Sequence, residues 1–250
     1  MAVKRRRSLE TDNLTSLGVS ADGEILDDWD KIVKICNAGR AEEFYSIGNW
    51  KNLDWGTYGS KEVMISGFNR RVLSNKDGVA NTSWMCCGYI IGGTVAVAWS
   101  KDPMRTSLNG EIKDNILEIV KDNLKEVLNY SDYLWVMKDG AAVQEGSWVE
   151  ETADYLWVPD VGDYYNSSDK GGCKEVFDSS RFYGKFPYSV NGSGTYVNLR
   201  GATKVYAPYN SEKSIYRQLL KKNGGYNVKF DFNDDDNRLN GNCIVPCFCI

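Results

Sequence analysis

The chain contains no histidine among its 250 residues. Without imidazole, Ser-His-Asp and Cys-His catalysis, histidine-ligated metals and the most common general base are excluded. Enzymes that lack histidine rely on paired carboxylates or on lysine. One candidate pair, Glu150 and Glu151, is expected at the surface, because adjacent positions on a chain point apart and nothing places an acid opposite them. We therefore expect no catalytic residue, no cofactor and a protein that is not an enzyme.

Metal ligands at a recognised spacing are also missing. The seven cysteines are an odd number and form no Cys-x-x-Cys pair, so we expect free, mostly buried thiols and no zinc site. The acidic run from Asp231 to Asp236 offers oxygen ligands for calcium. Its spacing differs from the twelve-residue calcium loop, because Asp236 stands at the glycine position and Asn242 at that of the bidentate glutamate. A solvated acidic turn is favoured, and no metal is predicted.

No apolar run is long enough to span a bilayer, and the basic N-terminus has no apolar segment behind it. We therefore expect neither a transmembrane segment nor a signal peptide. The net charge of -4 gives no general attraction to nucleic acid. Residues 1–25 are interpreted as a flexible arm that either stays solvated or docks on an acidic neighbour in an assembly. Its basic run consists of Lys4, Arg5, Arg6 and Arg7.

Helical periodicity predicts two main helices. The first begins at Asp27 and Asp28 and ends at Gly39. The second is capped by Asn109 and is the stronger of the two. Its apolar positions are Ile112, Ile116, Ile119, Val120 and Val127. A further short helix is predicted behind a Ser211 cap, with inward-facing positions at Ile215, Leu219 and Leu220.

Strand patterns predict a small β-meander that leads into a strand at residues 62–68. Further strands are predicted at residues 133–138, 155–158 and 194–199, in an alternating run from Tyr226 to Phe232, and at the C-terminus. Residues 133–138 and 155–158 read YLWVMK and YLWV. Because these two segments are alike, we expect them to pair in one sheet.

A polar cluster directly precedes the main predicted helix. Trp99, Arg105 and Asn109 set an indole, a guanidinium and an amide beside a segment that we expect to be buried. We interpret these residues as structural. In this interpretation Arg105 holds loop carbonyls or a carboxylate and does not touch a substrate.

Tyrosine is abundant, with 15 residues, and from residue 162 onward it is interleaved with Ser, Asn and Gly. This is the composition of a binding surface formed by loops, where tyrosine supplies rigid contact area. Ordinary loops of a β-rich domain with half-buried tyrosines are an equally weighted alternative. The residues predicted to bind a ligand are Tyr183, Tyr188, Asn191, Tyr196, Asn198, Tyr206, Tyr209 and Tyr226.

The order of several segments resembles a bacterial and prophage domain family of unknown function. These segments are YSIGNWKNLDW, VMISGFNRRVL, WSKDPMRTSLN, YLWVMK, DYLWVPDVGDYY and the terminal GNCIVPCFCI. The family carries a W-x-x-S-x-x-R-x-x-LN-like element, which Trp99, Ser100, Arg105, Leu108 and Asn109 match in kind, with Ser100 directly after the tryptophan. It ends in a G-V-x-P-x-F-x-I-like strand, matched in kind by Gly241, Ile244, Pro246, Phe248 and Ile250. That ending is similar to the C-type-lectin-like fold of phage variable proteins diversified by retroelements.

The resemblance implies an α+β, C-type-lectin-like fold with a mixed or antiparallel sheet, two main helices and long loops. Residues 26–250 would form a single domain, with a β-meander lobe to about residue 98 and a lectin-like core over residues 99–250. It also implies a phage virion structural protein, such as a tail fibre, head fibre or decoration protein, made in the host cytoplasm. Its domain would bind a host-surface glycan or protein, its arm would contact other virion proteins, and we expect a homo-oligomer.

Two other functions stay open. One is a purely architectural virion subunit, with the tyrosine surface buried between subunits. The other is a carboxylate-based cell-wall glycosidase, which needs two carboxyl groups facing each other across a cleft at about 5 to 10 Å.

Overall fold

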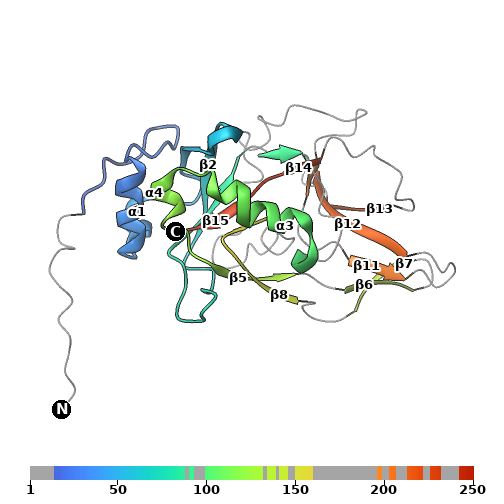
Figure 1. Ribbon diagram of the computed structural model, residues 1–250. Coiled ribbons are helices and arrows are strands. Elements are labelled where there is room, and N and C mark those ends of the chain that lie inside the picture. The colour runs from blue at the N-terminus through green and yellow to red at the C-terminus, as the bar shows by residue number, and fades with distance from the viewer. Residues whose placement is uncertain are drawn as a thin grey trace, which may run out of the picture.

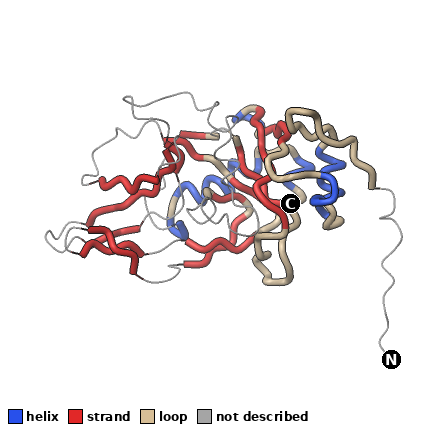
Figure 2. Tube along the Cα trace, turned by 180° about the vertical axis from the view of Figure 1, so that it is seen from behind, coloured by secondary structure: helices blue, strands red, loops and turns tan. Residues whose placement is uncertain are grey.

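The computed structural model describes residues 14–87, 90–92, 99–131, 134–138, 141–145, 150–159, 196–198, 203–206, 213–221, 226–231 and 242–250. These residues combine short helices with mostly antiparallel strands, so the α+β class is confirmed (Figures 1 and 2). None of the helices in the described stretches has the length and apolar character needed to cross a bilayer.

The helical segments are short. They are α1 (Trp29–Asn37), α2 (Ala41–Phe44), α3 (Pro103–Ser107) and α4 (Glu118–Lys121), with the 3-10 turns η2 (Gly56–Tyr58) and η3 (Trp99–Lys101) and the π-helical turn η4 (Leu108–Ile112). The strands are β1 (Trp50–Asp54), β2 (Ser60–Phe68), β3 (Thr82–Cys86), β4 (Ile91–Gly92), β5 (Val127–Ser131), β6 (Leu134–Lys138), β7 (Ala141–Glu145), β8 (Glu150–Asp154), β9 (Leu156–Trp157), β10 (Tyr196–Asn198), β11 (Thr203–Tyr206), β12 (Lys213–Lys221), β13 (Tyr226–Asp231), β14 (Asn242–Ile244) and β15 (Cys247–Cys249).

The first sheet has the strand order β1-β2-β3-β15-β9, and every neighbouring pair is antiparallel. Strands β1 to β3 form the predicted meander. The C-terminal strand β15 lies between β3 and β9, so the last residues of the chain are inside the sheet. In Figure 1 this strand runs through the middle of the described region.

Large aromatic side chains fill the core beneath this sheet. Trp84 on β3 stacks on Phe248 on β15, with ring centroids 6.1 Å apart and ring planes 4° from parallel. Trp29 also packs against Trp84, at a centroid distance of 5.2 Å. Because these rings come from α1, β3 and β15, the core joins the two ends of the sequence.

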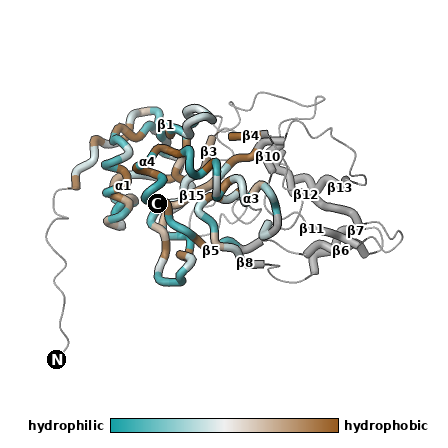
Figure 3. Tube along the Cα trace, viewed as in Figure 1, coloured by the Kyte–Doolittle hydropathy of each residue, from teal (hydrophilic) through white to brown (hydrophobic). Residues whose placement is uncertain are grey.

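The helix α1 forms as predicted. Asp28 caps it by accepting the backbone N–H of Lys31 at 2.8 Å, and Gly39 follows the end of the helix with φ +73°. The alternation of apolar and polar colours along α1 in Figure 3 reflects its amphipathic sequence. Its apolar side, with Ile32 and Cys36, is buried against the core.

The main predicted helix is corrected in both position and length. Helical structure begins at Pro103, behind a cap formed by Asp102, and Asn109 lies inside the helical region and does not cap it. The helical path is interrupted before α4, because the N–H of Leu117 donates to Asp54 on β1. Val127 already belongs to β5. The apolar periodicity therefore came from two short helices that face the same core.

The second sheet has the order β11-β12-β10-β14-β4, with β13 on the other edge of β12. The helix predicted behind Ser211 is wrong, because residues 213–221 form β12. This strand pairs with β10, β11 and β13, and pairing on both edges overrides the helical spacing of its apolar residues. Strands β10 and β13 lie within the stretches predicted as strands.

Two short strand pairs complete the described structure. The predicted pairing of YLWVMK with YLWV is wrong, because β6 forms a hairpin with β7 and β9 pairs with β15. Strand β5 pairs with β8, which leads directly into β9. Segment 71–74 is attached to β5 through a bridge between Leu73 and Val127.

Candidate functional site

The buried carboxylate of Asp154, at the end of β8, is the centre of a polar corner. Its side chain is 0% exposed. Four segments supply its hydrogen-bond donors: Trp99 Nε1 at 3.0 Å, Arg105 Nε at 2.6 Å, Asn129 Nδ2 at 3.1 Å and Thr152 Oγ1 at 2.7 Å. Because both carboxylate oxygens accept bonds from protein groups, this carboxylate serves as an internal anchor.

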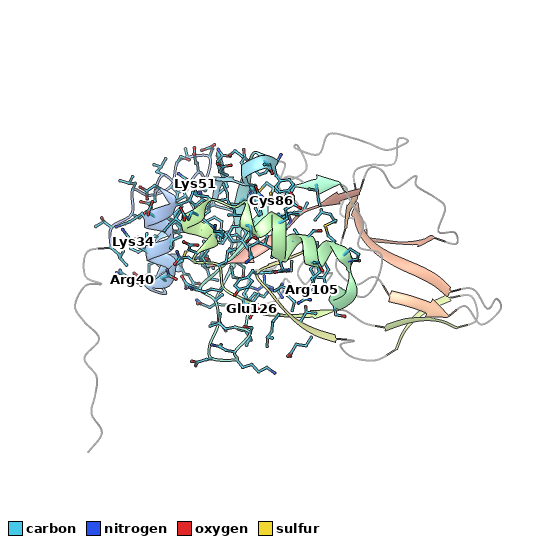
Figure 4. The ribbon with its side chains drawn as sticks, viewed as in Figure 1. Lys34, Arg40, Lys51, Cys86, Arg105 and Glu126 are labelled. Atoms are coloured by element: carbon cyan, nitrogen blue, oxygen red, sulfur yellow. The ribbon has the colours of Figure 1, made fainter. Side chains whose placement is uncertain are left out.

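Arg105 lies on α3 at the edge of this corner (Figure 4). In addition to its ion pair with Asp154, its Nη2 donates to the carbonyl of Ala153 at 2.9 Å. A carboxylate and a backbone carbonyl are the two kinds of acceptor that the sequence predicts for it. The Arg105 side chain is 30% exposed, so this ion pair is only partly screened by water.

Asn109 joins the helical region to the outer edge of β9. Its Oδ1 accepts the backbone N–H groups of Tyr155 and Leu156 at 2.8 and 3.1 Å, and its Nδ2 donates to the carbonyl of Leu156 at 2.9 Å. The amide thus takes the place that a neighbouring strand would occupy at this edge. The π-helical turn η4, which contains Asn109 and the distorted Gly110, sets the amide beside the strand.

Sequence reasoning missed Asp154, the residue on which the corner depends. It considered the adjacent pair Glu150 and Glu151, of which Glu151 is exposed and forms an ion pair with Lys76 at 3.5 Å. A usable signal was present nearby: Thr152 and Asp154 are two apart just before the predicted strand at residues 155–158, so in an extended chain they share one face.

Four of the eight predicted ligand-binding residues lie on described strands. By register, Tyr196 and Asn198 on β10 pair with positions 221 and 219 of β12, and Tyr206 on β11 pairs with position 213. Because odd positions of β12 share one face, these three register positions belong to the same face of the second sheet. Tyr226 pairs with position 220 and takes a register position on the opposite face.

The remaining predicted binding residues lie outside the described residues. These are Tyr183, Tyr188, Asn191 and Tyr209. The basic run at residues 4–7 also lies outside them, as do residues 232–236 of the acidic segment. In the part of the chain that the structure describes, no group of three His, Cys, Asp or Glu residues is placed to hold a metal ion.

A second buried carboxylate, that of Asp27, holds the root of the N-terminal arm. Tyr45 donates its hydroxyl to Asp27 at 2.8 Å, the backbone N–H of Leu17 donates at 2.8 Å, and the Ser16 hydroxyl also donates. Burial raises the pKa of Asp27, but these hydrogen bonds outweigh burial and bring the pKa below its ordinary value. The same burial raises the pKa of Tyr45.

The described cysteines whose side chains can be placed are buried thiols outside any disulfide, as predicted. They are Cys36, Cys86, Cys87, Cys247 and Cys249. Burial raises the pKa of Cys36 and of Cys249 to about 11, although Thr82 and Ser83 contact their sulfurs. Such thiols are poor nucleophiles at neutral pH and act as small apolar side chains.

No protein-family model matches the chain, and no curated protein and no solved structure matches it. The family resemblance therefore stays a prediction.

Proposed function

We propose that the chain is a phage virion structural protein that displays a C-type-lectin-like domain for binding to a host surface. The observation that carries this proposal is the common face of the second sheet that Tyr196, Asn198 and Tyr206 share by register. Strands β10 and β11 both pair with β12, near its two ends. Tyrosine and asparagine at these positions offer ring surface and amide groups, the chemistry with which proteins contact sugars and polar protein surfaces.

The connection between the two sheets supports this display role. Strand β14 belongs to the second sheet and β15 to the first, and only Val245 and Pro246 separate them. Val245 is fully buried, and the carbonyl of Pro246 accepts the N–H of Cys86 at 3.0 Å. A sheet joined so closely to a packed core presents its face with little loss of conformational entropy on binding.

The position of β15 supports the lectin-like part of the proposal. A lectin-like ending requires the last strand to lie inside the main sheet, and β15 pairs with β3 on one edge and β9 on the other. The polar corner around Asp154 then fixes β8 and β9 beside this strand. In this proposal the second sheet contacts the host surface, and the first sheet with the polar corner supplies its rigid support.

Binding to glycan arrays and to host cells tests this function. A double variant, Tyr196→Ala with Tyr206→Ala, should bind at least about tenfold more weakly, because truncation of tyrosine anchors in an interface is among the most costly changes to its affinity. The matched control is Tyr216→Ala, since position 216 of β12 alternates with the odd positions and lies on the opposite face by register. Circular dichroism checks that each variant folds.

The outcomes separate the alternatives. Equal binding by the double variant and the wild type would reject this face. No binding to any surface by the wild type, with normal incorporation into particles, would favour a purely architectural subunit. Release of sugar fragments from cell wall by the wild type would favour the glycosidase.

A further inference from the structure

Strand register divides the residues of the second sheet between two faces of different charge. Directly opposed positions of antiparallel strands share a face, and every second residue of a strand returns to it. The face on which positions 196, 198 and 206 lie also contains the odd positions of β12 and β13 and position 204 of β11. We call it the tyrosine face. Its charged residues on β11, β12 and β13 are Lys204, Lys213, Arg217, Lys221, Lys229 and Asp231.

The tyrosine face is basic, although the chain as a whole is acidic. Five cations and one carboxylate give these positions a formal charge of +4, whereas the whole chain carries -4. The positions of β10, β11, β12 and β13 that lie on the opposite face hold no charged residue. An anionic ligand is therefore the electrostatic complement of the face that contains the two tyrosines.

Two of these cations are directly opposed in the sheet. Arg217 on β12 pairs in register with Lys229 on β13. Like charges at opposed positions destabilise a sheet, so sheet stability does not explain this pair. A bound anion would offset the repulsion, because one negative group can accept hydrogen bonds from both cations. The pair therefore marks a position at which we expect an anionic group of the ligand.

The basic positions of β12 are spread along the whole strand. Lys213, Arg217 and Lys221 recur every four residues. At about 3.3 Å per residue, successive cations are about 13 Å apart and the row is about 26 Å long. A single anionic sugar can contact one member of this row, whereas an extended polymer with repeated charges can contact all three. The spacing favours a polymer.

Amide groups share the tyrosine face with the cations. Asn198 on β10 and Asn227 on β13 are both opposed to Leu219, from the two edges of β12. Amides donate to and accept from hydroxyl groups, which sugars carry on each unit and which single-stranded DNA lacks along its chain. With the rings of Tyr196 and Tyr206, this combination favours a charged polysaccharide over a nucleic acid.

We propose that the tyrosine face binds a polysaccharide whose repeat units carry negative charge. The rings and amides contact the sugars, and the cations contact the anionic groups. This inference rests on the proposed function, because it assigns the ligand class of the same face. Carboxylates of uronic acids and phosphodiesters of teichoic acids supply the same charge to such polymers, so both serve as probes. Because the attraction is electrostatic, salt weakens it.

Surface plasmon resonance of the full-length chain on immobilised polymers tests the proposal. The probes are polygalacturonate, purified wall teichoic acid, neutral dextran and single-stranded DNA. The wild type should bind at least one of the two anionic polysaccharides about tenfold more tightly than dextran, and more tightly than the DNA. Added NaCl should weaken this binding. The preferred probe shows whether the anionic group is a carboxylate or a phosphodiester.

Two charge variants locate the binding on this face. Arg217→Gln with Lys229→Gln should weaken binding at least about tenfold and make it less sensitive to NaCl. Because this change relieves a like-charge pair, the thermal unfolding midpoint should stay the same or rise, which separates lost binding from lost folding. A second variant, Lys213→Gln with Lys221→Gln, should act on binding in the same direction.

The matched control removes two charges from the other end of the molecule. It is Lys34→Gln with Lys121→Gln, which changes basic residues in the last turns of α1 and α4. Figures 1 and 4 place Lys34 at the end of the molecule opposite to β12. This control has the same net charge as each charge variant and should bind as the wild type does.

Several results would overturn the proposal. They are binding that both charge variants leave unchanged, an equal loss in the control, and binding to the anionic polysaccharides that is no tighter than to dextran. Tighter binding to single-stranded DNA than to either polysaccharide would identify a nucleic-acid ligand instead. If only the variant Tyr196→Ala with Tyr206→Ala loses host-cell binding and the charge variants keep it, the proposed function stands and the ligand class is wrong.

Discussion

At the scale of single residues, one carboxylate joins segments that are distant in the sequence. Asp154 on β8 accepts bonds from Trp99 and Arg105, about fifty residues before it, and from Asn129 on β5. Hydrogen bonds to a buried charge are stronger than those between neutral groups, and leaving one unmade is costly. The stability of the frame should therefore be sensitive to small changes at this corner.

Replacement of Trp99 by phenylalanine removes one donor to Asp154 and also part of the buried ring volume, a loss that a matched Trp→Phe control shares. Hydrogen bonds to charged groups contribute about 1.5 to 3 kcal/mol, so Trp99→Phe should lower the free energy of unfolding by about that much more than a matched control. The control is Trp55→Phe, since Trp55 is also fully buried and its Nε1 has no partner in the described structure. Urea denaturation measures both, and equal losses would contradict the anchoring role of Asp154.

The carboxylate of Asp27 predicts a dependence of stability on pH. Its pKa in the folded state is lowered, so the unfolded chain binds the proton more tightly. The stabilisation is complete above the unfolded pKa of about 3.9 and is lost as the pH falls through the folded pKa. Asp27→Asn should therefore destabilise the protein at neutral pH, and the difference should shrink below about pH 4. Unfolding free energies measured across this range would refute the assignment if the difference stayed constant.

At the scale of elements, the sequence was most informative where local signals and packing agree. The helix α1 has a capping aspartate, an apolar face and a terminal glycine, and it forms as predicted. Residues 213–221 have helical spacing but form a strand, because pairing on both edges decides their structure. The interruption before α4 depends on a bond between Leu117 and Asp54, a long-range contact that periodicity does not reveal.

Some residues of the candidate sites could likewise be predicted from the sequence, and others could not. Trp99, Arg105 and Asn109 could be singled out because unusual polar groups precede an apolar segment. Their common partner Asp154 was missed. Its two-residue spacing from Thr152 indicates a shared strand face, but only the fold brings β8 to the helix. Likewise, the tyrosines are evident from composition, but their division between two faces follows from strand register.

The amide of Asn109 should protect the edge of β9. In Asn109→Ala the N–H groups of Tyr155 and Leu156 lose their acceptor, so their hydrogen exchange should become faster while that of β3 changes little. The control is Asn123→Ala, which removes a similar bond from an asparagine Nδ2 to the carbonyl of Ile119 at 2.9 Å. Unchanged exchange at residues 155 and 156 would show that the edge is closed by something else.

At the scale of the whole molecule, the core joins the two ends of the chain through α1, β3 and β15, and it encloses free thiols. Cys36 and Cys249 both lie in this core. These buried thiols react only after the core has unfolded, so the rate of their reaction reports global unfolding.

Alkylation followed by mass spectrometry should find the five buried cysteines unmodified in the folded protein and modified in denaturant. The raised pKa of about 11 for Cys36 and Cys249 adds to this protection. Because unfolded thiols ionise first, stability should also fall as the pH rises above about 9. Rapid modification of Cys36 or Cys249 under native conditions would contradict a closed core.

The central proposal is that the chain contacts a host surface through the face of the second sheet on which positions 196 and 206 lie by register. The most direct test is competition for particle adsorption, in which purified chain is added in excess to bacterial cells before a phage whose particles carry the chain. The account predicts that the wild-type chain reduces adsorption and that the Tyr196→Ala, Tyr206→Ala variant does not. Adsorption that both chains reduce equally, or that neither reduces, would contradict it.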